Sequence, residues 1–165
     1  MQMHSFANPM LLAQSLAEVV AGELRAAIKN KGNATLAVSG GSTPARFFST
    51  LSDQVLDWEN VTVTLVDERW VDANHDRSNA KLVKDNLLKH EAAAAQFRSL
   101  YRQTPEPEEA LEDIEAALIS HLPLDVAVLG MGADGHTASF FPGGEGLAAA
   151  VDINSEAVVC AVRSQ

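Results

Sequence analysis

Hydrophobic residues in the first part of the chain follow the period of an α-helix. Over Pro9–Lys31 they recur every three or four positions, and Gly32 and Asn33 then supply a stop signal. Short apolar runs follow, and we expect buried strands at residues 35–39, 61–66, 125–129 and 157–162. Runs that are apolar throughout are typical of strands covered on both faces, as in a parallel sheet.

Helical patterns fill the intervals between these strands. They begin near residue 44, around residue 82 and around residue 111, and a brief further helix is expected at Leu147–Ala150. The alanine-rich residues 91–96 extend or cap the second pattern. The alternation predicts an α/β fold: a three-layer, Rossmann-like, mostly parallel sheet with helices on both faces, in one domain over residues 1–165. Ligands bind such sheets outside the carboxyl ends of the strands.

Composition narrows the classes of partner. The chain has 165 residues, and 12 Lys and Arg against 22 Asp and Glu give a formal charge of -10, which argues against a broad nucleic-acid or anionic-membrane surface. We recognise neither a signal peptide nor a membrane span. The single cysteine, Cys160, lies in an apolar run where we expect a core position, and it can form no intramolecular disulfide. These features predict a cytoplasmic protein, and they indicate no particular protein partner.

The loop after the first strand has the composition of an anion site. It contains Ser39, Gly40, Gly41, Ser42, Thr43 and Pro44. Adjacent glycines let the backbone turn sharply and approach a ligand, and Thr43 is a suitable N-cap for the helix that follows. Free N–H groups at a helix start favour phosphate, and Arg46 can add charge. An ordinary strand-to-helix turn explains this loop equally well.

Charged residues follow the second strand. Burying Asp67, Glu68 and Arg69 is costly unless they face solvent, pair with one another or hold a ligand. Further along, Arg77 and Lys81 lie four apart on the expected helix and share one face. That face either binds an anion or is simply solvated.

The loop at residues 130–143 contains Asp134 and His136 among glycines. Its opening matches G-x-G-x-x-G, but a dinucleotide site would need a helix, for which there is little room before Pro142. A core histidine would find few packing partners here, so His136 is the candidate base: a free imidazole, with a pKa of about 6.5, can take a proton from water. Asp134 orients it or binds a hydroxyl of the ligand. The other four histidines receive no role, and no spacing of ligand residues indicates a metal site.

Three stretches together resemble one protein family. They are residues 36–44 (LAVSGGSTP), residues 66–70 (VDERW) with 77–79 (RSN), and residues 128–142 (VLGMGADGHTASFFP). In this order and spacing they are similar to the 6-phosphogluconolactonases, which are related to the glucosamine-6-phosphate deaminases. The resemblance implies an enzyme that hydrolyses 6-phospho-D-glucono-1,5-lactone to 6-phosphogluconate, in the oxidative pentose phosphate pathway, without a cofactor.

The resemblance also implies roles for residues of all three loops. It assigns the catalytic histidine to His136 and places Asp67 at the sugar, while Arg69 and Arg77 help to hold the phosphate or the hydroxyls. The family's phosphate loop falls on Gly40, Gly41, Ser42 and Thr43.

Two departures from the family pattern matter. In the deaminase branch the histidine is typically followed by Ile-Ala-Phe-Asn-Glu-Pro, whereas residues 137–142 here read TASFFP and lack that glutamate, which favours the lactonase branch. Family members also continue beyond the point matched by Gln165, so we expect a chain that lacks its C-terminal part and leaves one edge or face of the sheet uncovered. An amino-sugar-phosphate isomerase or deaminase, and a non-catalytic sugar-phosphate binder, remain the alternatives.

Overall fold

A parallel sheet of four strands forms the centre of the computed structural model, which describes residues 2–41 and 43–164. The strand order is β3-β2-β1-β4, and each neighbouring pair is parallel. The strands are β1 (Ala34–Val38), β2 (Val61–Leu65), β3 (Gln96–Arg98) and β4 (Val126–Val128). The predicted α/β class is therefore confirmed.

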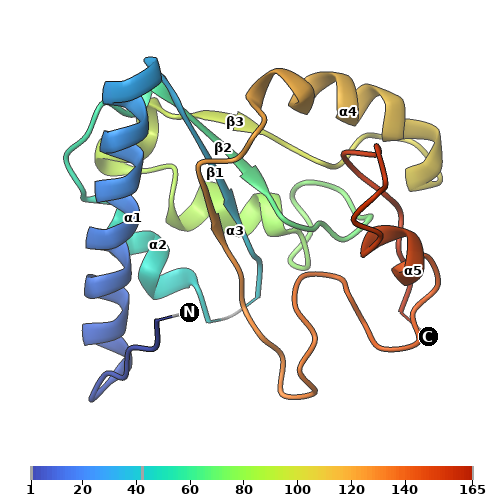
Figure 1. Ribbon diagram of the computed structural model, residues 1–165, viewed down its shortest axis with the longest axis horizontal. Helices are drawn as coiled ribbons and strands as arrows, with labels where there is room; N and C mark the ends of the chain where they lie inside the picture. The colour runs from blue at the N-terminus through green and yellow to red at the C-terminus, as the bar shows by residue number, and fades with distance from the viewer. Residues whose placement is uncertain (1, 42, 165) are drawn as a thin grey trace.

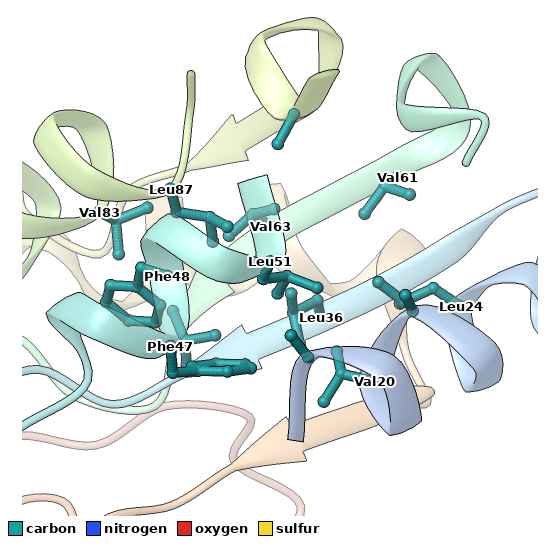
Figure 2. Packing of buried hydrophobic residues seen from close by; sticks show 14 of the residues in the cluster. Val20, Leu24, Leu36, Phe47, Phe48, Leu51, Val61, Val63, Val83 and Leu87 are labelled. Carbon is teal, nitrogen blue, oxygen red and sulfur yellow. The ribbon is translucent and has the colours of Figure 1, made fainter. Parts of the chain in front are cut away.

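Helix α1 (Pro9–Lys31) has the bounds that the hydrophobic period predicts. The Asn8 side chain caps its first turn by accepting from the amide of Leu11, and Gly32 ends it with a φ of 85°, a conformation that costs glycine little. Figure 2 shows Val20 of this helix packed toward the sheet near Leu36 of β1. Burying a side chain such as Leu36 contributes roughly 1.5–3 kcal/mol.

The first face of the sheet carries the main core. Alternate residues of β1 and β2, such as Leu36 and Val63, pack against α1, α2 (Ala45–Ser52) and α3 (Asn79–Asn86). Two short 3-10 helices lie near the same core, η1 (Trp58–Asn60) and η2 (His90–Ala94). Phe48 of α2 is fully buried there.

The second face is covered more thinly. A 3-10 helix, η3 (Pro107–Ala110), leads into α4 (Leu111–Leu118), η4 (Ile119–His121) follows it, and α5 (Leu147–Ala150) lies on the same side (Figure 1). A cavity of about 790 Å³ separates these elements from the sheet. Its walls include Thr35 and Ala37 of β1, Ala127 of β4 and Ile114 of α4. Among the described residues, no helix is long and apolar enough to cross a membrane.

The prediction of a strand at residues 157–162 is wrong. This segment makes no sheet pairing, and the nearby bridge between Glu145 and Arg163 is isolated. Val158 and Val159 instead pack against the residues of α4, and the amide of Val158 donates to the Glu115 carboxylate at 3.3 Å. The apolar run therefore reflects side-chain packing on α4. Strand pairing would also require a neighbouring strand with free backbone N–H and C=O groups.

Three smaller expectations also differ from the structure. The strand expected to be buried at residues 125–129 is shorter and only partly covered, with Ala127 and Leu129 exposed, because it lies at the edge of the sheet on its thinly covered side. Cys160 is exposed rather than in the core, because the irregular segment around it turns only part of its apolar side chains inward. The edge strand β3 was not anticipated, since it has three residues and two of them, Gln96 and Arg98, are polar.

Candidate active site

All three candidate loops leave the same edge of the sheet. β1, β2 and β4 run parallel, so the loops at residues 39–44, 66–78 and 129–143 all start from carboxyl ends. In Figure 1 the cyan turn after β1 and the orange loop after β4 lie together at the lower side of the view. The amide of Ser39 donates to the carbonyl of Val128 at 3.0 Å, which continues the pairing of β1 and β4 into the loops.

The loop after β1, which we call the phosphate loop, presents a helix start to this edge. Gly41 has a φ of 97°, which glycine adopts without strain, and Ser42 lies outside the described residues. α2 begins at Ala45 with Pro44 at its N-cap position, and no side chain caps it. The N-cap predicted at Thr43 is therefore wrong, because the helix begins one residue later than expected. Helix geometry still leaves the first N–H groups of α2 without intrahelical acceptors.

Glu68 organises the loop after β2. One of its carboxylate oxygens accepts from the amides of Asn79, at 2.7 Å, and Arg69, at 2.8 Å. The other accepts from the amide of Ala80, at 2.8 Å, and from the hydroxyl of Ser78, at 3.2 Å. A carboxylate at the start of α3 satisfies orphan N–H groups and opposes the positive end of the helix dipole. Glu68 thus ties this loop to α3.

Asp67 links two further segments. The hydroxyl of Ser139 donates to one of its carboxylate oxygens at 2.7 Å, across 72 residues of chain. The Asn79 amide group donates to the backbone carbonyl of Asp67 at 2.9 Å and reaches its other carboxylate oxygen at 3.4 Å. The second and third loops are therefore in direct contact.

The two arginines of the second loop lie together beside the cavity. The Arg69 guanidinium donates to the Arg77 carbonyl at 3.0 Å, and Asp67, Arg69, Arg77 and Ser139 all line the cavity. Arg77 precedes α3 rather than lying on it, so the helical face expected to join it to Lys81 does not exist. Residues 75–78, which include Arg77, form a turn. Lys81 lies on α3 and forms ion pairs with Asp85 and Asp76.

His136 and Asp134 form a close pair in the third loop, which we call the histidine loop. Their Nδ1 and Oδ1 atoms are 2.5 Å apart, and the side chain of His136 is 28% exposed. The hydrogen bond from His136 lowers the pKa of the Asp134 carboxyl, which therefore stays ionised at neutral pH. An ionised carboxylate only accepts, so Nδ1 carries the proton of this hydrogen bond, and the neutral form of the ring then has its free lone pair on Nε2.

The surroundings of His136 restrict its ring. A Cβ on Gly132 would lie 2.3 Å from His136 Cε1 and 2.6 Å from Asp134 Oδ1, so the present arrangement of both side chains depends on glycine at this position. The Phe141 ring lies against the imidazole, with centroids 4.6 Å apart. The loop closes on itself, because the Gly132 amide donates to the His136 carbonyl at 2.8 Å.

The geometry of these loops also bears on a dinucleotide site and on a metal site. No helix follows the glycines of the histidine loop before α5, so the loop lacks the helix start that a dinucleotide site requires. Within residues 2–41 and 43–164, no three His, Cys, Asp or Glu side chains gather as a metal site would need.

The sequence reading missed Glu68, Asn79 and Ser139 as organising residues. All three lie inside the family-like stretches, but they were given no roles of their own. Apart from Arg69 beside Glu68, the partners that give them this role lie 10 to 72 residues away in the chain. The capping pattern of Ser78 and the residues after it signals the start of α3, yet the carboxylate that completes the cap comes from Glu68, ten residues earlier in the same loop.

Comparison with known proteins points to one family. The family model described as glucosamine-6-phosphate isomerases/6-phosphogluconolactonase matches residues 7–165. The chain is 58% identical over 152 residues to a 6-phosphogluconolactonase of Rhizobium meliloti, which covers 91% of this chain and 65% of the relative. It is 49% identical over 162 residues to a 6-phosphogluconolactonase of Mesorhizobium japonicum, and this match covers 98% of this chain and 68% of the relative. The chain thus spans about two thirds of the length of these relatives.

Solved structures agree with the fold. A crystal structure of a 6-phosphogluconolactonase from Shewanella baltica superposes with a TM-score of 0.92 at 41% identity, covering 97% of this chain and 68% of the other. A monomeric glucosamine-6-phosphate deaminase reaches a TM-score of 0.73 at 21% identity, which speaks for the shared fold alone.

Proposed function

The chain belongs to the family of glucosamine-6-phosphate isomerases and 6-phosphogluconolactonases, and we propose that it supplies the site that hydrolyses 6-phospho-D-glucono-1,5-lactone to 6-phosphogluconate. The observation that carries the proposal is the His136–Asp134 pair, held at the same sheet edge as the amide-rich start of α2. The proposal includes a small sugar phosphate as the ligand, a cytoplasmic location and no cofactor.

The phosphate loop provides for the phosphoryl group. Gly40, Gly41, Ser42 and Thr43 lead into α2, whose first N–H groups and positive dipole end favour an anion. Arg69 and Arg77 lie at the neighbouring loop and bring positive charge to the phosphate or the sugar hydroxyls.

His136 acts on water at the lactone carbonyl. Its Nε2 takes a proton as the water oxygen bonds to C1, and the tetrahedral intermediate then expels the ring oxygen. The same imidazole returns the proton to that leaving oxygen, which becomes a hydroxyl of the opened chain, and the single product, 6-phosphogluconate, carries both this hydroxyl and the new carboxylate. Asp134 holds the ring in the required tautomer, and backbone N–H groups of the histidine loop stabilise the oxyanion.

Asp67 faces the sugar in this proposal. Its carboxylate accepts from Ser139 and from Asn79, and a carboxylate has about four lone-pair sites in all. Acceptor capacity therefore remains for a sugar hydroxyl. The residues after His136, TASFFP, lack the glutamate of the deaminase branch, which supports hydrolysis over deamination.

The test is an assay of lactone opening by the purified chain. The lactone opens spontaneously, so the enzymatic rate is taken as the excess over buffer alone. We expect a clear excess with the phosphorylated lactone and no ammonia from glucosamine 6-phosphate. Ammonia release would move the function to the deaminase branch, and 6-phosphogluconate binding without turnover would leave a sugar-phosphate binder.

A further inference from the structure

A hydrogen-bonded chain crosses the site through Asp67. The Ser139 hydroxyl donates to its carboxylate at 2.7 Å from the histidine loop. The Asn79 side chain donates to its carbonyl at 2.9 Å from the start of α3. Asp67 itself follows β2, so a single residue joins three segments of the site.

Asn79 extends this chain to the phosphate loop. Its side chain is buried, with 2% exposed, and a Cβ added to Gly40 would lie 1.8 Å from its Oδ1 atom. The amide therefore lies directly against the backbone of the phosphate loop. The backbone amide of Asn79 donates to Glu68 at 2.7 Å and its side chain donates to the Asp67 carbonyl at 2.9 Å, so the buried residue has little freedom to move.

Ser139 extends the chain in the other direction, to the imidazole. The Ser139 carbonyl accepts from the amide of Phe141 at 3.0 Å, and the Phe141 ring lies against His136. A second turn bond, from the amide of Phe140 to the carbonyl of Thr137 at 3.0 Å, keeps this segment tight. A shift of Ser139 must therefore move the ring that supports His136.

We propose that Ser139 and Asn79 are positioning residues, which act through Asp67 to set the distance between the phosphate loop and His136. The inference rests on the lactonase function proposed above. Hydrogen bonds to an ionised carboxylate are among the stronger ones in proteins, and reacting groups tolerate little displacement. Ser139 then governs how the lactone carbonyl meets His136, and Asn79 governs how the phosphate is held.

The first test compares Ser139→Ala with Ser139→Thr, which keeps the hydroxyl. We expect Ser139→Ala to lower kcat about tenfold or more, since small misplacements near the reacting atoms are costly. KM and the affinity for 6-phosphogluconate should stay within about twofold, because those depend mainly on the phosphate loop. Ser139→Thr should recover most of kcat. Ser5→Ala, at an exposed position that does not line the cavity, is the matched control and should behave as the unaltered chain.

The second test asks whether the effect passes through Asp67. In a double-mutant cycle with Asp67→Asn, the loss caused by Ser139→Ala should largely disappear, because residues acting as a unit are not additive. Asn79→Ala should instead raise KM and weaken 6-phosphogluconate binding. If Ser139→Ala does not fold, Ser139→Cys replaces it in the same cycle.

The outcomes separate the two proposals. A lactonase that keeps its full kcat in Ser139→Ala, or whose losses simply multiply with Asp67→Asn, overturns the positioning role while the function stands. If the unaltered chain shows no hydrolysis, the function fails, and NMR of the His136 ring then tests the positioning. Its resonances should shift in Ser139→Ala and return in Ser139→Thr; unchanged resonances would refute the inference.

Discussion

Ser39 and Gly130, 91 residues apart in the chain, are joined by a hydrogen bond of 3.0 Å from the Gly130 amide to the Ser39 hydroxyl. The same hydroxyl donates to the carbonyl of Val128, also at 3.0 Å. The side chain is buried, with 8% exposed, at the carboxyl ends of β1 and β4. The phosphate loop and the histidine loop therefore leave the sheet from one bridged point, which supports the proposal that they serve one ligand.

Gly132→Ala should disable the histidine without unfolding the chain. The added Cβ would lie within 2.6 Å of atoms of both His136 and Asp134, so both side chains must move away from their present positions. We expect a loss of about a hundredfold in kcat, with normal circular dichroism. At Gly130 a Cβ meets nothing within 4 Å, so Gly130→Ala should lose far less. Equal losses in the two variants would contradict the proposed contact.

Gly40→Ala should weaken phosphate binding. Its Cβ would lie 1.8 Å from the buried Asn79 side chain, and relieving that clash should cost about 1–3 kcal/mol of unfolding free energy. Calorimetry with 6-phosphogluconate should give about tenfold lower affinity. A Cβ at Gly22 of α1 would meet nothing within 4 Å, so Gly22→Ala should instead raise the free energy of unfolding in urea by about 0.5–1 kcal/mol. A fully stable Gly40→Ala with normal affinity would argue against this packing.

Glu68→Gln tests the capping role of that carboxylate. The amide cannot accept all four of the donors that Glu68 accepts now, so the free energy of unfolding should fall by about 1.5–3 kcal/mol. Urea denaturation measures this loss. Glu91→Gln, at an exposed position, should change stability by less than about 0.5 kcal/mol. A similar small change at Glu68 would mean that its hydrogen bonds are weak in solution.

The sequence predicted most of the fold because its signals there are local. The hydrophobic period of α1 and the glycine after it predict where this helix begins and ends. The apolar runs of β1 and β2 predict strands that are buried along their whole length. The run at residues 157–162 carries the same signal, yet it packs on α4 without a strand partner. No residue of that run is fully buried and Cys160 is exposed, so apolar composition alone determines neither burial nor a pairing partner.

The sequence predicted which loops meet at one end of the sheet but not the hydrogen bonds that connect them. The polar, glycine-rich setting of His136 singled it out as the candidate base, and that role stays a prediction. The bonds from Ser139 to Asp67 and from Glu68 to the start of α3 join distant segments, and no local pattern encodes them. The N-cap predicted at Thr43 failed by one residue, which is within the usual spread of helix ends.

Asp134 should leave no trace in the pH dependence of the rate near neutrality. The hydrogen bond from His136 lowers the pKa of its carboxyl in the folded chain, so its stabilising effect is present above the unfolded pKa and is lost only as the pH falls through the lowered value. Asp134 therefore stays ionised around neutral pH and should add no limb to the pH–rate profile there.

Asp134→Asn should lower kcat by at least about tenfold, because the amide can donate to Nδ1 and favour the wrong tautomer. A pH–rate series, corrected for hydrolysis in buffer, measures both effects. An additional acid limb that vanishes in Asp134→Asn, or full activity in that variant, would contradict this role.

The most direct measurement is the rate of 6-phosphogluconolactone hydrolysis by His136→Ala beside the unaltered chain. The account predicts a fall on the order of a hundredfold toward the buffer rate, with 6-phosphogluconate affinity preserved because the phosphate loop is intact. A variant that hydrolyses the lactone as fast as the unaltered chain would contradict the account.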